Sequence, residues 1–352
     1  MAVGIEITDN ALVELEARLL NTSGQVPLHD RFRALFTLKA IGGQRAVNII
    51  GKGFVDPSAL LKHELAYVLG QINDPSGIPI LSATLADKKE DPMVRHEAAE
   101  ALGAISDYDS LPLLRRYLED PERVVRETCD IAIAKIQWDQ SPEGCAERAR
   151  QEEEKREAER NGTLRQFTSI DPAPPSLSSD PSSGHSGLLR GSKSASDVPH
   201  LRDRLLDTTL PLFERYRAMF ALRNIGSPAA IDALADGFGD DSALFKHEIA
   251  FVFGQLADPH AIPSLLKVLR TSAESDMVRH EAAEALGGIA EVDQDKPIVV
   301  DGERVDVQKV LKEWMLKPDA PEVVKQSCQV AVDMWEVRLN CDSGISRIAL
   351  TG

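Results

Sequence analysis

The chain has 352 residues, long enough for two domains or one elongated repeat array, and its 43% hydrophobic and 27% charged residues are typical of a soluble globular protein. The formal net charge of -16 argues against general nucleic-acid binding, because neutralising phosphates requires clustered Lys and Arg. The charge suits a cationic partner, or serves solubility alone.

The start of the chain, residues 1–20, has neither the basic segment nor the apolar run of a signal peptide, and no stretch of about 18 apolar residues follows. The four cysteines (129, 145, 328 and 341) form no Cys-x-x-Cys pair. We therefore expect a cytoplasmic protein without a membrane span, with the nucleus as a second location. Cys129 and Cys328 lie inside helical patterns and are expected to be buried thiols.

Internal repeats dominate the sequence. The stretch RFRALFTLKAIG at 31–42 returns as RYRAMFALRNIG at 215–226, and the same offset of 184 residues aligns much of the two halves without gaps. Within each half a shorter period of 33 residues separates similar segments, for example MVRHEAAEALGAI at 93–105 from the segment around His63. Such periods are typical of stacked supersecondary units, and we expect about four units in each half.

Each unit is expected to be a pair of helices. In residues 74–105, Asp91 and Pro92 form a helix-start signal between two segments whose apolar residues recur at helical spacing. Small alanines in the second segment allow neighbouring helices to approach closely. Gly70 and Gly254 are expected to be helix-packing or C-cap positions.

Three regions follow from this organisation: an N-terminal repeat half at 1–145, a charged helical extension and flexible linker at 146–202, and a C-terminal repeat half at 203–352. The linker is rich in Ser, Pro and Gly and too poor in apolar residues to fold by itself. A tether of this length would let the halves face one another. The segment 296–310 has an Asp-Gly turn between β-prone runs and is expected to form a surface hairpin.

The unusual feature is a His-Glu pair that occurs four times in matching registers. The pairs are His63-Glu64, His96-Glu97, His247-Glu248 and His280-Glu281. The corresponding positions of the outer units hold Arg126-Glu127 and Lys325-Gln326, so packing alone does not require histidine there. Imidazole and carboxylate are common ligands of iron, zinc and manganese, and two His with one carboxylate are typical of iron(II) oxygen chemistry.

Stacking places His63 and His96 on neighbouring helices about 10 Å apart at the backbone, so that both side chains can reach one ion. One metal per half follows, with the two metals meeting between facing halves. Successive helical residues point about 100° apart, so a His and its adjacent Glu seldom bind the same ion comfortably. Some glutamates are therefore left for a long cationic side chain, and the residues alone do not decide which.

Eight helical hairpins in two sets of four, with two Lys-His-Glu and two RHEAAEALG segments, resemble the deoxyhypusine hydroxylase family. The resemblance covers about 27–140 and 205–340. It implies an all-α fold, a HEAT-like hairpin-repeat superhelix with two pseudo-symmetric halves facing one another. It also implies a monomeric non-haem di-iron monooxygenase that uses O2 to hydroxylate deoxyhypusine on translation initiation factor five-A.

The family also implies roles for individual residues. His63, His96 and Glu97 would bind one Fe(II) ion, and His247, His280 and Glu281 the other. Glu64 and Glu248 would bind the amines of the substrate.

The roles of four neighbours of the candidate ligands remain open. Met93 and Met277 are candidate pocket-lining residues or plain core residues, and Arg95 and Arg279 are expected to be solvated or supporting groups. Two rival functions also remain. One is a metal-free HEAT-like scaffold, because phycobilin lyases share RxEAAEALG-like helices, and the other is a dizinc hydrolase with the same ligands.

Overall fold

The computed structural model describes residues 8–161, 169–176, 195–290, 298–300 and 302–342. These residues form seventeen α-helices and one two-stranded sheet, and they divide into two compact units, 1–173 and 174–352. No helix in the described ranges combines the length and the apolar character needed to cross a membrane.

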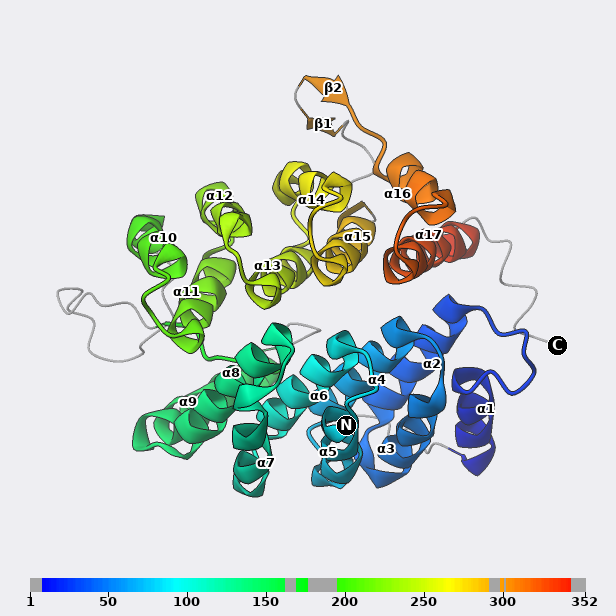
Figure 1. Cartoon of the computed structure of the whole chain (residues 1–352), viewed down its shortest axis with the longest axis horizontal. Helices are drawn as coiled ribbons and strands as arrows, with labels where there is room; N and C mark the ends of the chain where they lie inside the picture. Colours follow the sequence, from blue (N-terminus) through cyan, green and yellow to red (C-terminus); the bar gives the residue numbers. More distant parts are fainter. Residues whose placement is uncertain (1–7, 162–168, 177–194, 291–297, 301, 343–352) are drawn as a thin grey trace. The chain divides into compact units, whose positions relative to one another are not determined.

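The first unit consists of four helical hairpins followed by one further helix (Figure 1). Its helices are α1 (Asp9–Leu19), α2 (Leu28–Ile41), α3 (Gly43–Gly51), α4 (Ala59–Ile72), α5 (Ile78–Ala86), α6 (Pro92–Ile105), α7 (Leu111–Arg116), α8 (Arg123–Gln140) and α9 (Pro142–Arg160). The even-numbered helices from α2 to α8 pack in sequence to form one layer, and their odd-numbered partners form a second layer. The predicted hairpin repeat is confirmed.

The second unit repeats this design (Figure 1). Its helices are α10 (Val198–Leu206), α11 (Leu212–Ile225), α12 (Pro228–Asp236), α13 (Ala243–Leu256), α14 (Ile262–Arg270), α15 (Asp276–Ala290), α16 (Val307–Leu316) and α17 (Glu322–Asp342). The insertion before α16 forms the predicted hairpin, in which β1 (Val299–Val300) pairs antiparallel with β2 (Glu303–Arg304).

Short 3-10 helices join several of these elements. They are η1 (Lys52–Val55), η2 (Pro75–Gly77), η3 (Tyr108–Ser110), η4 (Tyr117–Glu119), η5 (Ala195–Asp197), η6 (Gly237–Gly239) and η7 (Pro259–Ala261).

Close helix approach is built into the layer that contains α4, α6 and α8. A Cβ added at Gly70 of α4 would lie 2.8 Å from the Cα of Ala101 on α6, and a Cβ at Gly103 would lie 2.9 Å from the Cβ of Ala132 on α8. Interior side chains tolerate no such overlap, so these glycines set the spacing of the helices. Of the two roles predicted for Gly70, the structure shows helix packing.

The region between the halves differs in part from its prediction. The charge run forms a separate helix, α9, because Ser141 adopts an extended conformation and ends α8. Residues 169–173 pack on the first unit: Ile170 donates its N–H to Gln71 Oε1 at 2.8 Å and accepts from Gln71 Nε2 at 3.1 Å, while Ala173 is fully buried. This short segment is therefore no free tether. Most of the remaining predicted tether lies outside the described residues.

The boundaries of the three predicted regions remain predictions. Helix α9 extends across position 145, and α10 extends across position 202.

Candidate metal centre

The Lys-His-Glu segments lie in the first half of α4 and α13, and both helices start in the same way. Ser58 accepts a hydrogen bond from the N–H of Leu61 at 3.1 Å, and Ser242 accepts one from Phe245 at 3.1 Å. These side chains satisfy backbone N–H groups at the open ends of the helices. The caps therefore help to define where each helix begins, and with it the direction in which the following His and Glu point.

The lysine of each segment connects one hairpin to the next. Lys62 Nζ lies 2.6 Å from both carboxylate oxygens of Glu90, in the turn before α6. Lys246 makes the same contacts with Glu274, at 2.7 and 2.6 Å, before α15. These four side chains are largely buried, and the paired charges hold the start of the following helix next to the histidine.

In the first half, the structure brings His63, His96 and Glu97 together. The ring centroids of the two histidines are 5.4 Å apart, and His63 Nε2 lies 3.2 Å from Glu97 Oε2. One ligand atom from each of the three residues lies within 4.8 Å of the others, and all three residues are buried. Two imidazoles and a carboxylate at this spacing fit a transition-metal ion.

In the second half, the contact between the two histidines and the contact between one histidine and the glutamate both recur. The rings of His247 and His280 are again 5.4 Å apart with the same interplanar angle of 46°, and His247 Nε2 lies 3.4 Å from Glu281 Oε2. His247, His280 and Glu281 are buried as well. Each half therefore gathers the three residues that the sequence analysis assigned to its metal.

The surroundings of His63 favour a positive charge. Burial by itself lowers the pKa of the ring, but the nearby carboxylates of Glu97 and Glu64 outweigh it and raise the pKa well above its usual value. The same negative potential would favour a bound cation.

The other glutamate of each half, Glu64 or Glu248, is also buried. In the first half, Glu64 Oε1 lies 3.4 Å from His63 Nδ1, whereas Glu97 approaches Nε2 of the same ring. Glu64 and Glu97 thus lie at opposite nitrogens of His63. Glu248 of the second half is only 3% exposed. In the first half, this separation agrees with the geometric expectation that one of the two glutamates is spare.

Lys39 of α2 lies near Glu64. Its Nζ is 5.0 Å from the ring centroid of Tyr67 and 5.7 Å from that of Phe36. Burial lowers the pKa of Lys39, and the negative charge of Glu64 partly offsets this effect. The carboxylate of Glu64 therefore has a cationic neighbour on the first unit.

Met93 and Met277 occupy the first turns of α6 and α15, three residues before a candidate ligand, and both are buried. Their role as pocket-lining residues remains a prediction.

Arg95 and Arg279 were expected to be solvated or supporting groups, and the structure excludes the solvated alternative. Arg95 is 2% exposed and forms a bidentate ion pair with Asp120, at 3.1 and 2.6 Å, while its Nε donates to the carbonyl of Leu85. Arg279 is 3% exposed and stacks on Trp314. Because each arginine precedes its histidine by one residue, it points away from the candidate metal ligands and into the contact with other hairpins.

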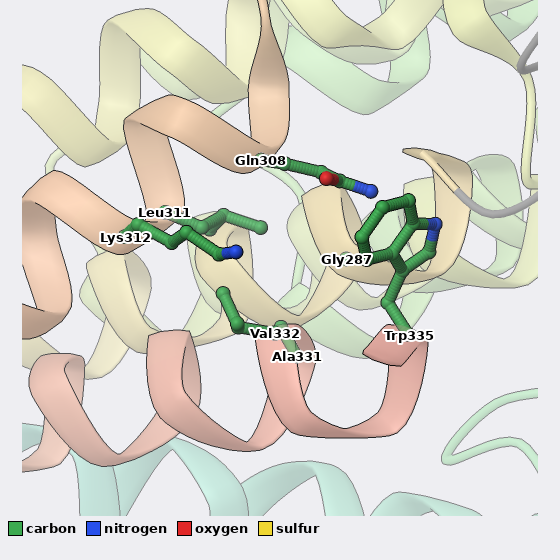
Figure 2. Close-up of a pocket in the computed structure, with 7 residues that line it drawn as sticks. All are labelled: Gly287, Gln308, Leu311, Lys312, Ala331, Val332 and Trp335. Carbon is green, nitrogen blue, oxygen red and sulfur yellow. The ribbon is translucent and has the colours of Figure 1, made fainter. Parts of the chain in front are cut away.

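The pocket drawn in Figure 2 lies elsewhere. It lies between α15, α16 and α17 and has a cavity volume of only about 10 Å³. Figure 2 shows that its walls are largely apolar, with the indole of Trp335 beside Gln308. Its lining residues are Gly287, Gln308, Leu311, Lys312, Ala331, Val332 and Trp335, and none of the predicted site residues is among them.

Sequence reasoning missed one acidic residue beside the candidate ligands. Glu284 lies one helical turn after His280, with its Oε1 3.5 Å from His280 Nδ1. The spacing of four residues on one helix was the available signal, since such residues share a helix face.

Comparison with known proteins supports the repeat architecture. A family model described as HEAT repeats matches residues 47–134, 83–151 and 231–332, and one described as PBS lyase HEAT-like repeat matches 214–240. The fold and the two His-His-Glu sets thus define a HEAT-repeat protein with a candidate metal centre in each half. The predicted all-α hairpin-repeat fold is confirmed.

Similar proteins give a more specific assignment. The chain is 57% identical over 337 residues to deoxyhypusine hydroxylase of Lentinula edodes, which covers 94% of this chain and 93% of that protein. It is 51% identical over 351 residues to the enzyme of that name from Cryptococcus neoformans, covering 97% and 89%. The solved structure of human deoxyhypusine hydroxylase in complex with glycerol matches with a TM-score of 0.73 and 40% identity, covering 93% and 96%. The chain belongs to the deoxyhypusine hydroxylase family, as the sequence resemblance predicted.

Proposed function

We propose that this protein hydroxylates the deoxyhypusine side chain of translation initiation factor five-A, with O2 as the co-substrate and two Fe(II) ions per chain. The observation that carries the proposal is the repeated set of two imidazoles and one carboxylate, gathered in each half of a deoxyhypusine hydroxylase family member. A single set would fit many metalloproteins, whereas the repetition matches a reaction that uses two ions.

The metal ligands in this proposal are His63, His96 and Glu97 in the first half and His247, His280 and Glu281 in the second. Three protein ligands leave coordination positions open for exogenous molecules. Two bound Fe(II) ions would supply the electrons and the binding positions needed to activate O2. The burial of all six residues limits access of bulk water to that chemistry.

The substrate side chain carries amines that are protonated in water, and Glu64 and Glu248 are the proposed partners. Charge-assisted hydrogen bonds from an ammonium group to a buried carboxylate are strong and directional. Because Glu64 lies 3.4 Å from His63 Nδ1, an amine bound there would hold the adjacent methylene groups close to the metal ligands. Met93 and Met277 are proposed to line the path of that apolar segment.

We expect anaerobically purified protein to contain about two iron ions per chain and to transfer one atom of labelled O2 to deoxyhypusine on the protein factor.

His96→Ala should remove the iron of the first half only. Glu64→Ala should weaken substrate binding but retain both metals at saturating Fe(II), because its carboxylate lies at Nδ1 of His63, whereas the proposed ligand Glu97 lies at Nε2.

Metal analysis of the same samples separates the alternatives. Stoichiometric zinc without hydroxylation would indicate a hydrolase, and protein that binds no metal would indicate a scaffold. Equal loss of iron in His96→Ala and Glu64→Ala would show that the glutamate roles are wrongly assigned.

A further inference from the structure

The second half contains a chain of three side chains that reaches from a candidate metal ligand to the neighbouring helix. On α15, Glu284 Oε1 lies 3.5 Å from Nδ1 of the fully buried His280. On α17, the fully buried Ser327 donates its hydroxyl hydrogen to the same carboxylate oxygen at 2.8 Å. The contacts therefore run from Ser327 through Glu284 to His280.

The position of Glu284 distinguishes the two nitrogens of the His280 ring. Nδ1 faces the carboxylate, so Nε2, on the opposite edge of the ring, is the nitrogen available to a metal. A carboxylate at the distal nitrogen of a metal-binding histidine fixes the tautomer and orientation of the ring and makes the ligand nitrogen more basic. Glu281, by contrast, approaches His247 at 3.4 Å and belongs to the metal set.

We infer that Glu284 is a positioning residue that orients His280 toward the second metal, and that Ser327 holds Glu284 in place. This inference rests on the proposed function in one respect, namely that His280 binds a metal. It adds a residue of α17 to the machinery, so that the last hairpin of the chain supports a ligand carried by the hairpin before it.

The first half supplies a matched comparison. Glu100 follows His96 by four residues, and Thr128 of α8 occupies the repeat position of Ser327. Thr128, however, donates its hydroxyl to the backbone carbonyl of Val124 at 2.8 Å. Because a hydroxyl has one hydrogen to donate, Thr128 does not support a carboxylate in the way that Ser327 does. Removing Thr128's hydroxyl is therefore a control for removing that of Ser327.

The test measures the Fe(II) affinity of one half at a time, anaerobically, in the full-length protein. In a His96→Ala background, which isolates the second half, Glu284→Ala should weaken iron binding about 10–100-fold, the usual effect of losing such a partner. Glu284→Gln retains an oxygen that can accept a hydrogen bond and should reduce the iron affinity less than Glu284→Ala does. Ser327→Ala should produce a smaller weakening, whereas Thr128→Ala in a His280→Ala background should leave iron affinity unchanged.

Thermal unfolding of each metal-free variant shows whether a loss of iron affinity reflects a loss of folding. Unchanged affinity in Glu284→Ala would overturn the inference. Complete loss of iron in both Glu284 variants, even at saturating Fe(II), would also overturn it, because Glu284 would then be a ligand. If the protein without substitutions bound no iron, the proposed function would fail together with this inference, so the two failures are distinguishable.

Discussion

Buried arginine-carboxylate pairs occur at equivalent places in several hairpins. Arg31 pairs with Asp56, Arg95 with Asp120 and Arg215 with Asp240. Each arginine also donates its Nε to a backbone carbonyl ten or twelve residues earlier. These side chains connect the two helices of one hairpin to the turn of the next, so their role is to align neighbouring repeats.

The Arg95–Asp120 pair gives a prediction at the residue scale. Burial acts to raise the pKa of Asp120, but hydrogen bonds from Arg95 and from the N–H of Glu122 outweigh it and lower the pKa below its ordinary value. Asp120→Asn should therefore reduce the free energy of unfolding of the metal-free protein by about 3–5 kcal/mol at pH 7. The reason is that this substitution leaves the buried guanidinium of Arg95 without its counter-charge.

The sign of the pH dependence follows from the lowered pKa. The contribution of Asp120 is fully present above the pKa of an unfolded aspartate, about 4, and is lost as the pH falls through the folded-state value. The stability difference between wild type and Asp120→Asn should therefore narrow below about pH 4 in urea titrations. The exposed Asp109 provides a control, since Asp109→Asn should show no comparable change. A difference that stays constant into acid would contradict the prediction.

At the scale of elements, the proposed metal ligands depend on how closely successive helices approach. His63 and His96 are on α4 and α6, whose contact includes Gly70 against Ala101. The corresponding contact of the second half, Gly254 against Ala285, is looser, because an added Cβ would lie 3.5 Å from its neighbours. The same glycine position therefore has room for a methyl group in the second half but not in the first.

We predict that Gly70→Ala lowers the free energy of unfolding by about 1–3 kcal/mol, because the new methyl group must displace the backbone of α6. It should also weaken iron binding in the first half by separating His63 from His96. Gly254→Ala should be neutral or stabilise by up to about 1 kcal/mol, because alanine is the better helix former and ordinary van der Waals contact is available. Calorimetry and iron titration of both variants provide the measurement, and equal destabilisation would show that the close contact is unimportant.

At the scale of the whole molecule, each half is a compact unit with its own hairpin stack and its own candidate ligands. Buried thiols contribute to these cores without redox chemistry: burial raises the pKa of both Cys129 and Cys328 to about 12, so neither forms a reactive thiolate at neutral pH. The predicted buried state of both cysteines is confirmed.

Metal binding should stabilise both halves, because an ion that binds only the folded state shifts the folding equilibrium toward that state. Fe(II) at about 100 times its Kd contributes about 2.7 kcal/mol to a folded state that binds it, which corresponds to a rise of about 5–10 °C in Tm for a unit of this size. Anaerobic calorimetry with and without Fe(II) measures the shift. His96→Ala combined with His280→Ala should abolish it, and a shift that persists in the double variant would mean that the iron binds elsewhere.

Much of this protein was predictable from its sequence because each repeat is a local structure. Helical periodicity, the Asp91-Pro92 start signal and the 33-residue spacing all act within one or two hairpins, and they determined the all-α repeat fold and the gathering of His63 with His96. Only the tertiary structure showed the buried pairing of Arg95, the docking of Ile170 on Gln71 and the contact of Ser327 with Glu284. Those contacts join residues 25 to 99 positions apart. A pattern of apolar and polar residues specifies which face of a helix is buried, but the partner of a buried polar group is decided only when distant helices pack together.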